Sequence, residues 1–86
     1  MIEIKKFSAD WCAPCRMVKQ TFNEIKSEVS DIRFTDIDVD ENTELAQKYG
    51  VRSIPMVVIE KDGQIIKKIT GSQSKANYIA AINECR

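Results

Sequence analysis

Two cysteines separated by two residues are the feature of the sequence with the clearest chemistry. Cys12 and Cys15 enclose Ala13 and Pro14 and directly follow Trp11. They stand between a β-branched stretch and a stretch with helical apolar spacing, which predicts that Cys12 lies at a helix N-terminus. Free N–H groups and the helix dipole at that end favour a thiolate, which is the reactive form of cysteine. Cys15 would lie one turn later on the same face and could attack a mixed disulfide formed at Cys12, so the spacing predicts thiol–disulfide exchange.

The cysteine pair also has two interpretations without redox chemistry. One is half of a structural zinc site, but such a site takes four protein ligands and Cys85 is the only other cysteine, so a second chain would have to contribute. The other is a pair of inert buried thiols, which a turn between strand and helix disfavours because it leaves at least one thiol accessible. We therefore expect no metal ligands. Cys85 lies in the last predicted helical turn, and we expect it to take no part in catalysis.

Both prolines fit the elements around them. Pro14 is tolerated in the first turn of a helix, where no intrahelical N–H donor is needed. Pro55 follows Ile54 and opens the third predicted strand, where a missing N–H does least harm. From the residues alone, Pro55 is an ordinary proline at the start of a strand.

Composition and charge narrow the classes of protein. The 86 residues suffice for one domain, which we expect to span positions 1–86, and 43% of them are hydrophobic and 30% charged. Basic and acidic residues balance at 13 each, whereas nucleic-acid binders usually carry a basic surplus. Histidine is absent, which excludes imidazole catalysis and zinc sites that contain histidine. The sequence contains no apolar run long enough to predict a membrane span, and no signal peptide is visible in it. We therefore expect no nucleic-acid or membrane partner and a cytoplasmic location.

The apolar pattern predicts an α/β fold with the element order β-α-β-α-β-β-α. The predicted strands are Ile2–Ser8, Ile32–Val39, Met56–Ile59 and Gln64–Thr70, and the predicted helices are Pro14–Val29, Glu41–Tyr49 and a last one capped by Ser72 or Ser74. The first two strands flank a helix, which predicts a parallel pair with a right-handed crossover. Asp62-Gly63 predicts a hairpin between the last two strands, and Gly50 ends the second helix. A mixed four-stranded sheet with helices on both faces follows.

Beyond the individual motifs, the sequence resembles the thioredoxin family along almost its whole length. The resemblance rests on the order and spacing of Phe7, Ala9-Asp10-Trp11-Cys12-Ala13-Pro14-Cys15, Asp38-Val39-Asp40-Glu41-Asn42, Tyr49-Gly50-Val51-Arg52-Ser53-Ile54-Pro55, Asp62-Gly63 and Gly71. Its most specific part is the cysteine pair together with the Ile54-Pro55 pair at this separation. The resemblance implies a thioredoxin-like fold and an enzyme that reduces protein disulfides through a dithiol.

The resemblance also implies a role for the residues around the cysteine pair. Cys12 would be the exposed nucleophile and Cys15 the buried resolving thiol. Pro55 would be cis and would pack against the pair, and the backbone of Ile54 would pair with an extended substrate. A small apolar docking surface around Cys12 would comprise Trp11, Ala13, Pro14, Ile54 and the region of Gly71.

The partners implied by the resemblance are of two kinds. Substrates would be proteins with exposed disulfides, and an upstream reductase such as a thioredoxin reductase would recycle the oxidised pair. The redox group would be the Cys12–Cys15 disulfide itself, since the sequence has no cofactor motif, and we expect a monomer. Two other functions stay open. One is a glutaredoxin-like redoxin, which Trp11 and the Ala-Pro between the cysteines disfavour, and the other is a protein-binding adaptor that works independently of redox state.

The sequence departs from the family pattern at several positions. The β-α unit that precedes this core in ordinary thioredoxins is missing, so we expect a minimal version of the fold. Ala13 stands where glycine is common, and Ser8 stands where an aromatic residue is frequent. Lys6 and Asp36 stand where the family usually has an aspartate and a lysine, respectively.

The exchanged signs of Lys6 and Asp36 suggest an ion pair behind Cys15. Exchanging both residues preserves the pairing, whereas a buried charge without its partner would be expensive. In this hypothesis Lys6 stabilises the Cys15 thiolate, and Asp36 accepts or relays the proton that Cys15 loses. The alternative is that both side chains reach solvent, Lys6 by extending its aliphatic stem along the surface.

Overall fold

The computed structural model describes all residues, 1–86, and has four strands and three helices in the predicted order. The strands are β1 (Ile2–Ser8), β2 (Ile32–Asp38), β3 (Met56–Lys61) and β4 (Gln64–Thr70), and the helices are α1 (Ala13–Glu28), α2 (Thr43–Lys48) and α3 (Lys75–Cys85). They form one mixed sheet in the order β2-β1-β3-β4, in which β1 is parallel to β2 and the other neighbours are antiparallel. This confirms the predicted α/β fold, including the parallel first pair and the final hairpin.

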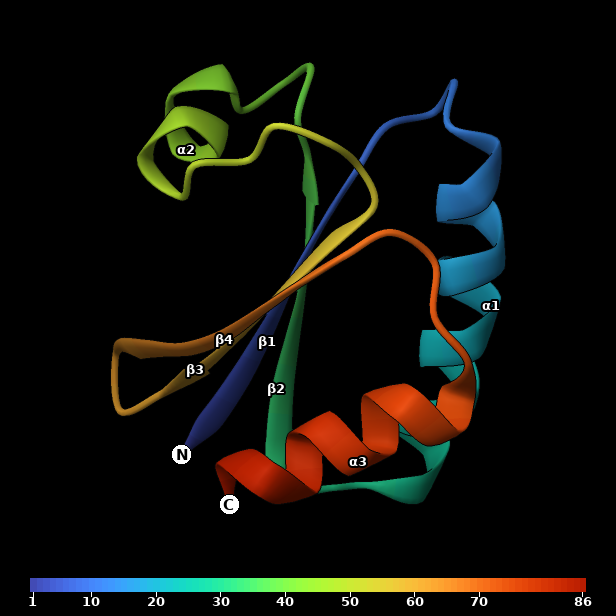
Figure 1. The fold of residues 1–86 in the computed structure, drawn as a ribbon, viewed down its shortest axis with the longest axis vertical. Coiled ribbons are helices and arrows are strands. Elements are labelled where there is room, and N and C mark those ends of the chain that lie inside the picture. Colours follow the sequence, from blue (N-terminus) through green and yellow to red (C-terminus); the bar gives the residue numbers. More distant parts are fainter.

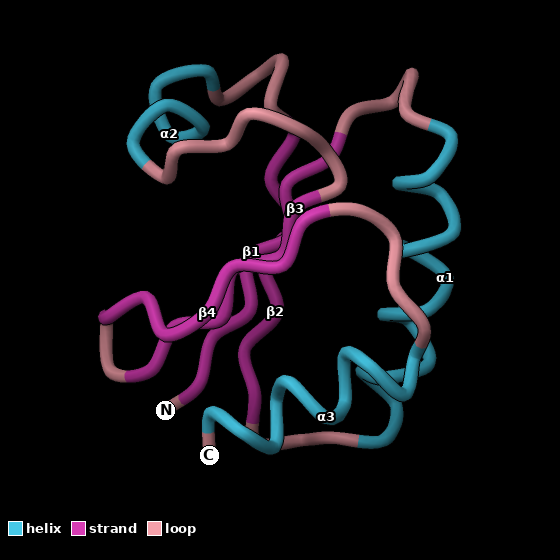
Figure 2. The backbone as a smooth tube through the Cα atoms, viewed as in Figure 1, coloured by secondary structure: helices cyan, strands magenta, loops and turns pink.

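The sheet lies between two helical layers. Figure 1 shows α1 and α3 on one side of the sheet and α2 on the other, and Figure 2 shows the strands crossing between them. Side chains alternate along β1. Ile2, Ile4 and Lys6 face α1 and α3, whereas Lys5 and Phe7 face the side of α2. The predicted placement of helices on both faces is confirmed.

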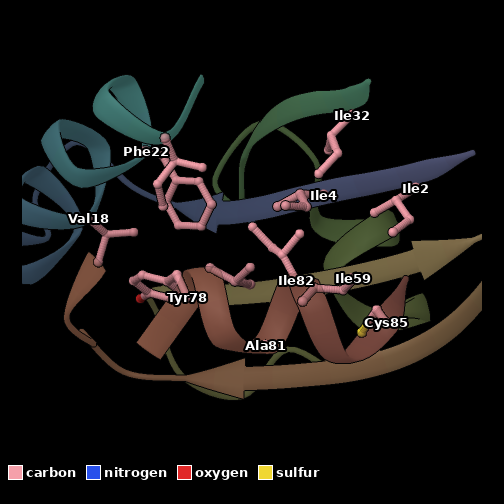
Figure 3. Packing of buried hydrophobic residues seen from close by; sticks show 12 residues of the cluster. Ile2, Ile4, Val18, Phe22, Ile32, Ile59, Tyr78, Ala81, Ile82 and Cys85 are labelled. Atoms are coloured by element: carbon pink, nitrogen blue, oxygen red, sulfur yellow. The ribbon is translucent and has the colours of Figure 1, made fainter. Parts of the chain in front are cut away.

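The larger core lies between the sheet and the layer of α1 and α3. Phe22 packs against Tyr78 with ring centroids 4.8 Å apart, which joins the two helices. Val18 and Ile25 lie on the same face of α1 as Phe22 and are fully buried, as their helical spacing predicts. Figure 3 shows Val18, Phe22 and Tyr78 meeting isoleucines from β1, β2 and β3. This packing fixes α1, the helix that carries Cys15, against the sheet.

A smaller core lies on the side of α2. Phe7 packs against Tyr49 with ring centroids 5.4 Å apart, and Ile37, Met56 and Val58 complete the cluster. Tyr49 directly follows α2. The cluster therefore holds the end of this short helix, and the loop that leads from it to β3, close to the sheet.

The hairpin between β3 and β4 turns at Asp62 and Gly63, as predicted. Their φ angles are 53° and 82°, and positive values at both central residues define the type I′ turn that suits a two-residue hairpin. The turn pairs Lys61 with Gln64. The far end of the hairpin then brings the residues after β4 back beside the start of β3.

The boundaries of α2 differ from the prediction. The helix begins at Thr43, whereas the apolar pattern predicts a start at Glu41. Asp38 accounts for the difference, because its carboxylate accepts the N–H of Asp40 and its carbonyl accepts the side chain of Asn42. These bonds fold the preceding residues into a turn before the helix can start.

Other boundaries shift less. β3 continues to Lys61, beyond the predicted end at Ile59, because Glu60 is buried and paired although its charge breaks the apolar pattern. Of the two serines proposed as caps, Ser74 caps α3 by accepting the N–H of Asn77 at 3.1 Å. None of the three helices is both long and apolar enough to cross a bilayer.

Candidate active site

The two cysteines of the motif form a disulfide at the N-terminus of α1. Cys12 is the N-cap residue, and its Sγ accepts the backbone N–H of Cys15 at 3.2 Å. Pro14 lies in the first turn, where its missing N–H leaves no helical hydrogen bond unmade. The Cα atoms of the two cysteines are 5.3 Å apart, which is ordinary for a bridged pair. The Cys12 sulfur therefore accepts an N–H that has no partner within the helix, as the sequence predicts.

The expected contrast in exposure between the two cysteines is wrong for this disulfide form. The resemblance implies an exposed Cys12 and a buried Cys15, but the two residues are 5% and 4% exposed. Both belong to a cluster with Ala9, and Val39 and Ile54 pack against it. Because the bridge directs the Cys12 sulfur toward Cys15, this side chain turns into the cluster and away from solvent.

Pro55 holds the loop between α2 and β3 in place beside the disulfide cluster. The peptide bond between Ile54 and Pro55 is cis, as the resemblance implies. The carbonyl of Pro55 accepts the N–H of Gly71 at 2.9 Å, and Tyr78 donates its hydroxyl to the carbonyl of Gly71 at 3.2 Å. The core helix α3 thus steadies the segment after β4, which in turn steadies the start of β3. Ile54 is thereby fixed against the cluster that contains Cys12.

An apolar groove of about 330 Å³ lies next to the disulfide cluster. Its lining includes Trp11 and Ile54, two of the residues expected to dock substrate, together with Val39 and Val51. Trp11 is 68% exposed, and its indole N–H donates to a carboxylate oxygen of Asp40 at 2.8 Å. This bond orients the indole at one end of the groove.

The docking surface expected from the sequence is only partly assembled around this groove. Ala13 and Pro14 are exposed at the start of α1, and Gly71 follows β4, but none of the three lines the groove. The sequence analysis in turn missed Val39 and Val51. These two residues follow β2 and α2, and only the fold brings them together.

The whole chain is similar to proteins of one family. The thioredoxin family model matches residues 2–84. The chain belongs to the thioredoxin family. It is 37% identical to the thioredoxin of Bacillus subtilis over 84 residues, which are 96% of this chain and 81% of that protein. It is 40% identical to the thioredoxin of Listeria monocytogenes over 79 residues, which are 91% of this chain and 77% of that protein.

Solved structures of thioredoxins share the fold. Mitochondrial thioredoxin 3 from Saccharomyces cerevisiae, in its oxidised form, has a TM-score of 0.90 at 32% identity, over 96% of this chain and 77% of that one. Fasciola hepatica thioredoxin has a TM-score of 0.93 at 29% identity, over 99% of this chain and 81% of that one. A third structure has a TM-score of 0.91 at 31% identity and covers 96% of this chain and 77% of its own. It concerns the thiol resolving mechanism in yeast mitochondrial 1-Cys peroxiredoxin via glutathione/thioredoxin systems.

This thioredoxin-family protein is a thiol–disulfide oxidoreductase. Its relatives are thioredoxins, and the Cys12–Cys15 disulfide occupies the position of their redox motif. The comparison also favours a thioredoxin over the glutaredoxin-like alternative that the sequence left open.

Lys6 and Asp36 of this thioredoxin-family chain form an ion pair, as their exchanged signs suggest. The two residues are opposite each other in β1 and β2, and Lys6 Nζ lies 3.2 Å from Asp36 Oδ1. The Lys6 side chain is 6% exposed and the Asp36 side chain 51%. The alternative in which both side chains reach solvent is therefore wrong for Lys6.

The surroundings of Lys6 shift its pKa in both directions. Burial, the largest cause, lowers the pKa of the Lys6 ammonium, while the charge and hydrogen bond of Asp36 raise it in part. The ammonium groups of Lys26 and Lys19 lower the pKa a little further. Lys6 and Asp36 also line a polar cavity of about 530 Å³, which touches Cys15 but not Cys12.

A second ion pair, with a buried carboxylate, lies on the other face of the sheet, and the sequence pattern does not reveal it. Glu60 accepts hydrogen bonds from the Tyr49 hydroxyl at 2.5 Å and from Lys5 Nζ at 2.9 Å. Burial alone would raise the pKa of Glu60, but these two bonds outweigh it and hold the pKa below its usual value. Burial would likewise lower the pKa of Lys5, but its bonds to Glu60 and Tyr49 hold it above its usual value. Strand alternation puts both charges on this face, but it does not reveal that they pair.

Cys85 lies apart from the redox pair. It is a free, buried cysteine at the end of α3 and belongs to the larger core. No group of three or more histidine, cysteine, aspartate or glutamate side chains is arranged to hold a metal ion.

Proposed function

We propose that this protein reduces disulfides of protein substrates, with Cys12 as the nucleophile and Cys15 as the resolving thiol. In the reduced protein, the Cys12 thiolate attacks one sulfur of the substrate disulfide, forms a mixed disulfide and releases the other substrate sulfur as a thiolate. Cys15 then loses its proton and attacks the Cys12 sulfur. This attack releases the second substrate thiolate and closes the Cys12–Cys15 bond. The substrate gains the electron pair that the dithiol loses, and the protons from the cysteines end on the substrate thiolates.

The observation that supports this proposal most strongly is the N-cap position of Cys12. Its sulfur accepts the N–H of Cys15 already in the disulfide, and the same donor would stabilise a thiolate after reduction. Pro14 restricts the backbone of this turn through its fixed φ. The nucleophile and the resolving thiol thus have a fixed geometry relative to each other.

We assign the apolar groove to the substrate chain. The backbone N–H and C=O of Ile54 take part in no hydrogen bond, so they are free to pair with an extended peptide. Pro55 would keep Ile54 in the orientation that presents these groups. Trp11 would contact an apolar side chain of the substrate in the groove, and Ala13 and Gly71 would border the approach to Cys12 from outside it.

The family relationship supports two kinds of partner. Substrates would be proteins with exposed disulfides, and a related structure concerns the resolving of a peroxiredoxin thiol via glutathione/thioredoxin systems. An upstream reductase such as a thioredoxin reductase would return the Cys12–Cys15 disulfide to the dithiol. We propose that the chain works as a monomer in the cytoplasm and uses no cofactor beyond this disulfide.

Insulin reduction by dithiothreitol tests the proposal. The wild-type protein should accelerate precipitation of the released insulin chain. Cys12→Ser and Cys15→Ser should each reduce the rate to that of dithiothreitol alone. Cys85→Ala is the matched control, because it removes the third thiol from the other core, and it should keep the wild-type rate.

Two results would overturn the proposal. Catalysis that persists in Cys12→Ser would remove the assigned nucleophile. A physiological partner bound equally well by the wild type and by the Cys12→Ser, Cys15→Ser double variant would instead indicate an adaptor, provided that the wild type fails to accelerate insulin reduction.

A further inference from the structure

The buried cation Lys6 lines a polar cavity that it shares with the resolving cysteine. The cavity touches Cys15 and does not touch Cys12. Apart from the cavity, Cys15 packs in the small apolar cluster with Cys12 and Ala9. The cavity, of about 530 Å³, is large enough to hold water, and polar side chains line most of it. Cys15 thus has a polar cavity on one side, with Lys6 in its wall.

The charged groups that face Lys6 come from two elements. β2 contributes Asp36, at 3.2 Å, and α1 contributes Lys19 and Lys26, which share the sign of Lys6. β3 faces Lys6 with the uncharged Val57. The remaining charged residues along the cavity are exposed or half-buried and are screened by water: Asp10, Arg16, Asp38 and Glu41. In the disulfide form, therefore, Asp36 is the only close anion of Lys6.

We propose that Lys6 is a positioning residue that stabilises the Cys15 thiolate across this cavity once the disulfide is reduced. The inference rests on the proposed function, in which Cys15 is the resolving thiol. Reduction allows a second anion, the Cys15 thiolate, to form at the cavity that Lys6 lines. In the disulfide form the only ionic partner of Lys6 is Asp36, which is half exposed. Attraction between unit charges falls only as the inverse of their distance. Lys6 and Cys15 are themselves buried, so their attraction is screened less than that of the exposed charges along the cavity, and direct contact is not required. The proton that Cys15 loses passes through the cavity to solvent.

Two consequences follow from this arrangement. A stabilised thiolate favours the dithiol over the disulfide, so the charge of Lys6 makes the protein a stronger oxidant than it would be without it. The coupling is also reciprocal, because a thiolate that Lys6 stabilises must stabilise the Lys6 ammonium by the same factor. The protonation of Lys6 and the redox state of the cysteine pair are therefore linked.

Lys6→Met tests the inference, because methionine keeps an unbranched chain of similar length without the charge. The titration of Cys15 in the reduced protein is followed through its Cβ chemical shift, which separates Cys15 from Cys12 and Cys85. The acid dissociation constant of Cys15 should fall about tenfold in Lys6→Met, and the equilibrium with glutathione should shift toward the disulfide by a similar factor. Lys26→Met is the matched control. Lys26 lies 3.9 Å from Asp36 but is partly exposed, so its removal should change either constant less than about twofold.

The wild-type protein provides a second measurement that needs no substitution in the core. The Lys6 titration, read from its Cε chemical shift, should occur at a higher pH in the reduced protein than in the oxidised one. The inference is overturned if folded Lys6→Met titrates Cys15 as the wild type does. If that variant does not fold, identical titration of Lys6 in the two redox states overturns it. Either result alongside normal insulin reduction would refute this inference alone, whereas a wild type that fails to reduce insulin would refute the redox function.

Discussion

Gly71 donates its backbone N–H to the carbonyl oxygen of Pro55 at 2.9 Å, which ties the end of β4 to the start of β3 at the redox site. Gly71 has a φ of 78°, in the left-handed region that side chains disfavour. Tyr78, from the core face of α3, donates its hydroxyl to the carbonyl of the same glycine. The loop that carries Ile54, the residue proposed to pair with a substrate, is therefore supported by a chain of hydrogen bonds that ends in the core.

Replacing this glycine should cost stability through backbone conformation. Gly71→Ala should lower the free energy of unfolding by about 1–2 kcal/mol, because an L-residue pays that amount in the left-handed region. No atom lies within 4 Å of the place a Cβ would occupy, so steric overlap does not contribute. Gly71→Asn should cost less, since asparagine visits this region more readily. Denaturant unfolding measures both variants, and equal losses for alanine and asparagine would contradict the conformational explanation.

The buried pair of Lys5 and Glu60 should make stability depend on pH in the acid range. The pKa of Glu60 is lowered in the folded protein, so its contribution is present above the ordinary value of 4.5 and is lost as the pH falls through the folded value. Glu60→Gln should flatten this acid loss. At neutral pH it should cost about 2 kcal/mol, because Lys5 and Tyr49 lose a charged partner.

Unfolding experiments over a range of acid pH measure the effect of Glu60→Gln. Glu84→Gln is the control, because Glu84 is an exposed carboxylate that pairs with an exposed lysine on the protein surface. It should leave the acid profile nearly unchanged. An acid profile that is the same in Glu60→Gln and in the wild type would show that Glu60 does not couple folding to pH.

The hydrogen bond between Trp11 and Asp40 should affect substrate binding more than folding. Both side chains are exposed, so Asp40→Ala should leave the free energy of unfolding nearly unchanged. Loss of one hydrogen bond that orients the indole, worth about 0.7 kcal/mol, should raise KM for a disulfide substrate about threefold. Asp40→Asn keeps an oxygen that can accept the indole N–H and should behave like the wild type. Steady-state kinetics measure KM for each variant, and an unchanged KM in Asp40→Ala would show that the bond does not position Trp11 for substrate.

The residues whose conformation depends on local sequence were predictable. The type I′ turn at Asp62 and Gly63 follows from two adjacent residues that tolerate positive φ. The N-terminal position of Cys12 follows from the change of apolar period around it. The pairing of Lys6 with Asp36 was also predictable, because it depends on parallel neighbours whose positions the family resemblance supplies.

Features that depend on packing between distant segments were not predictable. Nothing in the pattern of β3 shows that Glu60 is buried, because its burial depends on a lysine from β1 and a tyrosine that follows α2. The groove likewise needs Val39 and Val51 from two loops. The burial of Cys12 occurs here together with the bridge, which the sequence permits but does not impose.

Trapping of the mixed disulfide tests most directly the claim that Cys12 attacks and Cys15 resolves. Reduced Cys15→Ser is incubated with a peptide that contains one disulfide, and mass spectrometry locates the adduct. A stable adduct is expected at Cys12 in this variant, and none in the wild type, where Cys15 releases it. An adduct found at Cys85, or one that forms as readily at Cys15 in Cys12→Ser, would contradict the assignment of the two sulfurs.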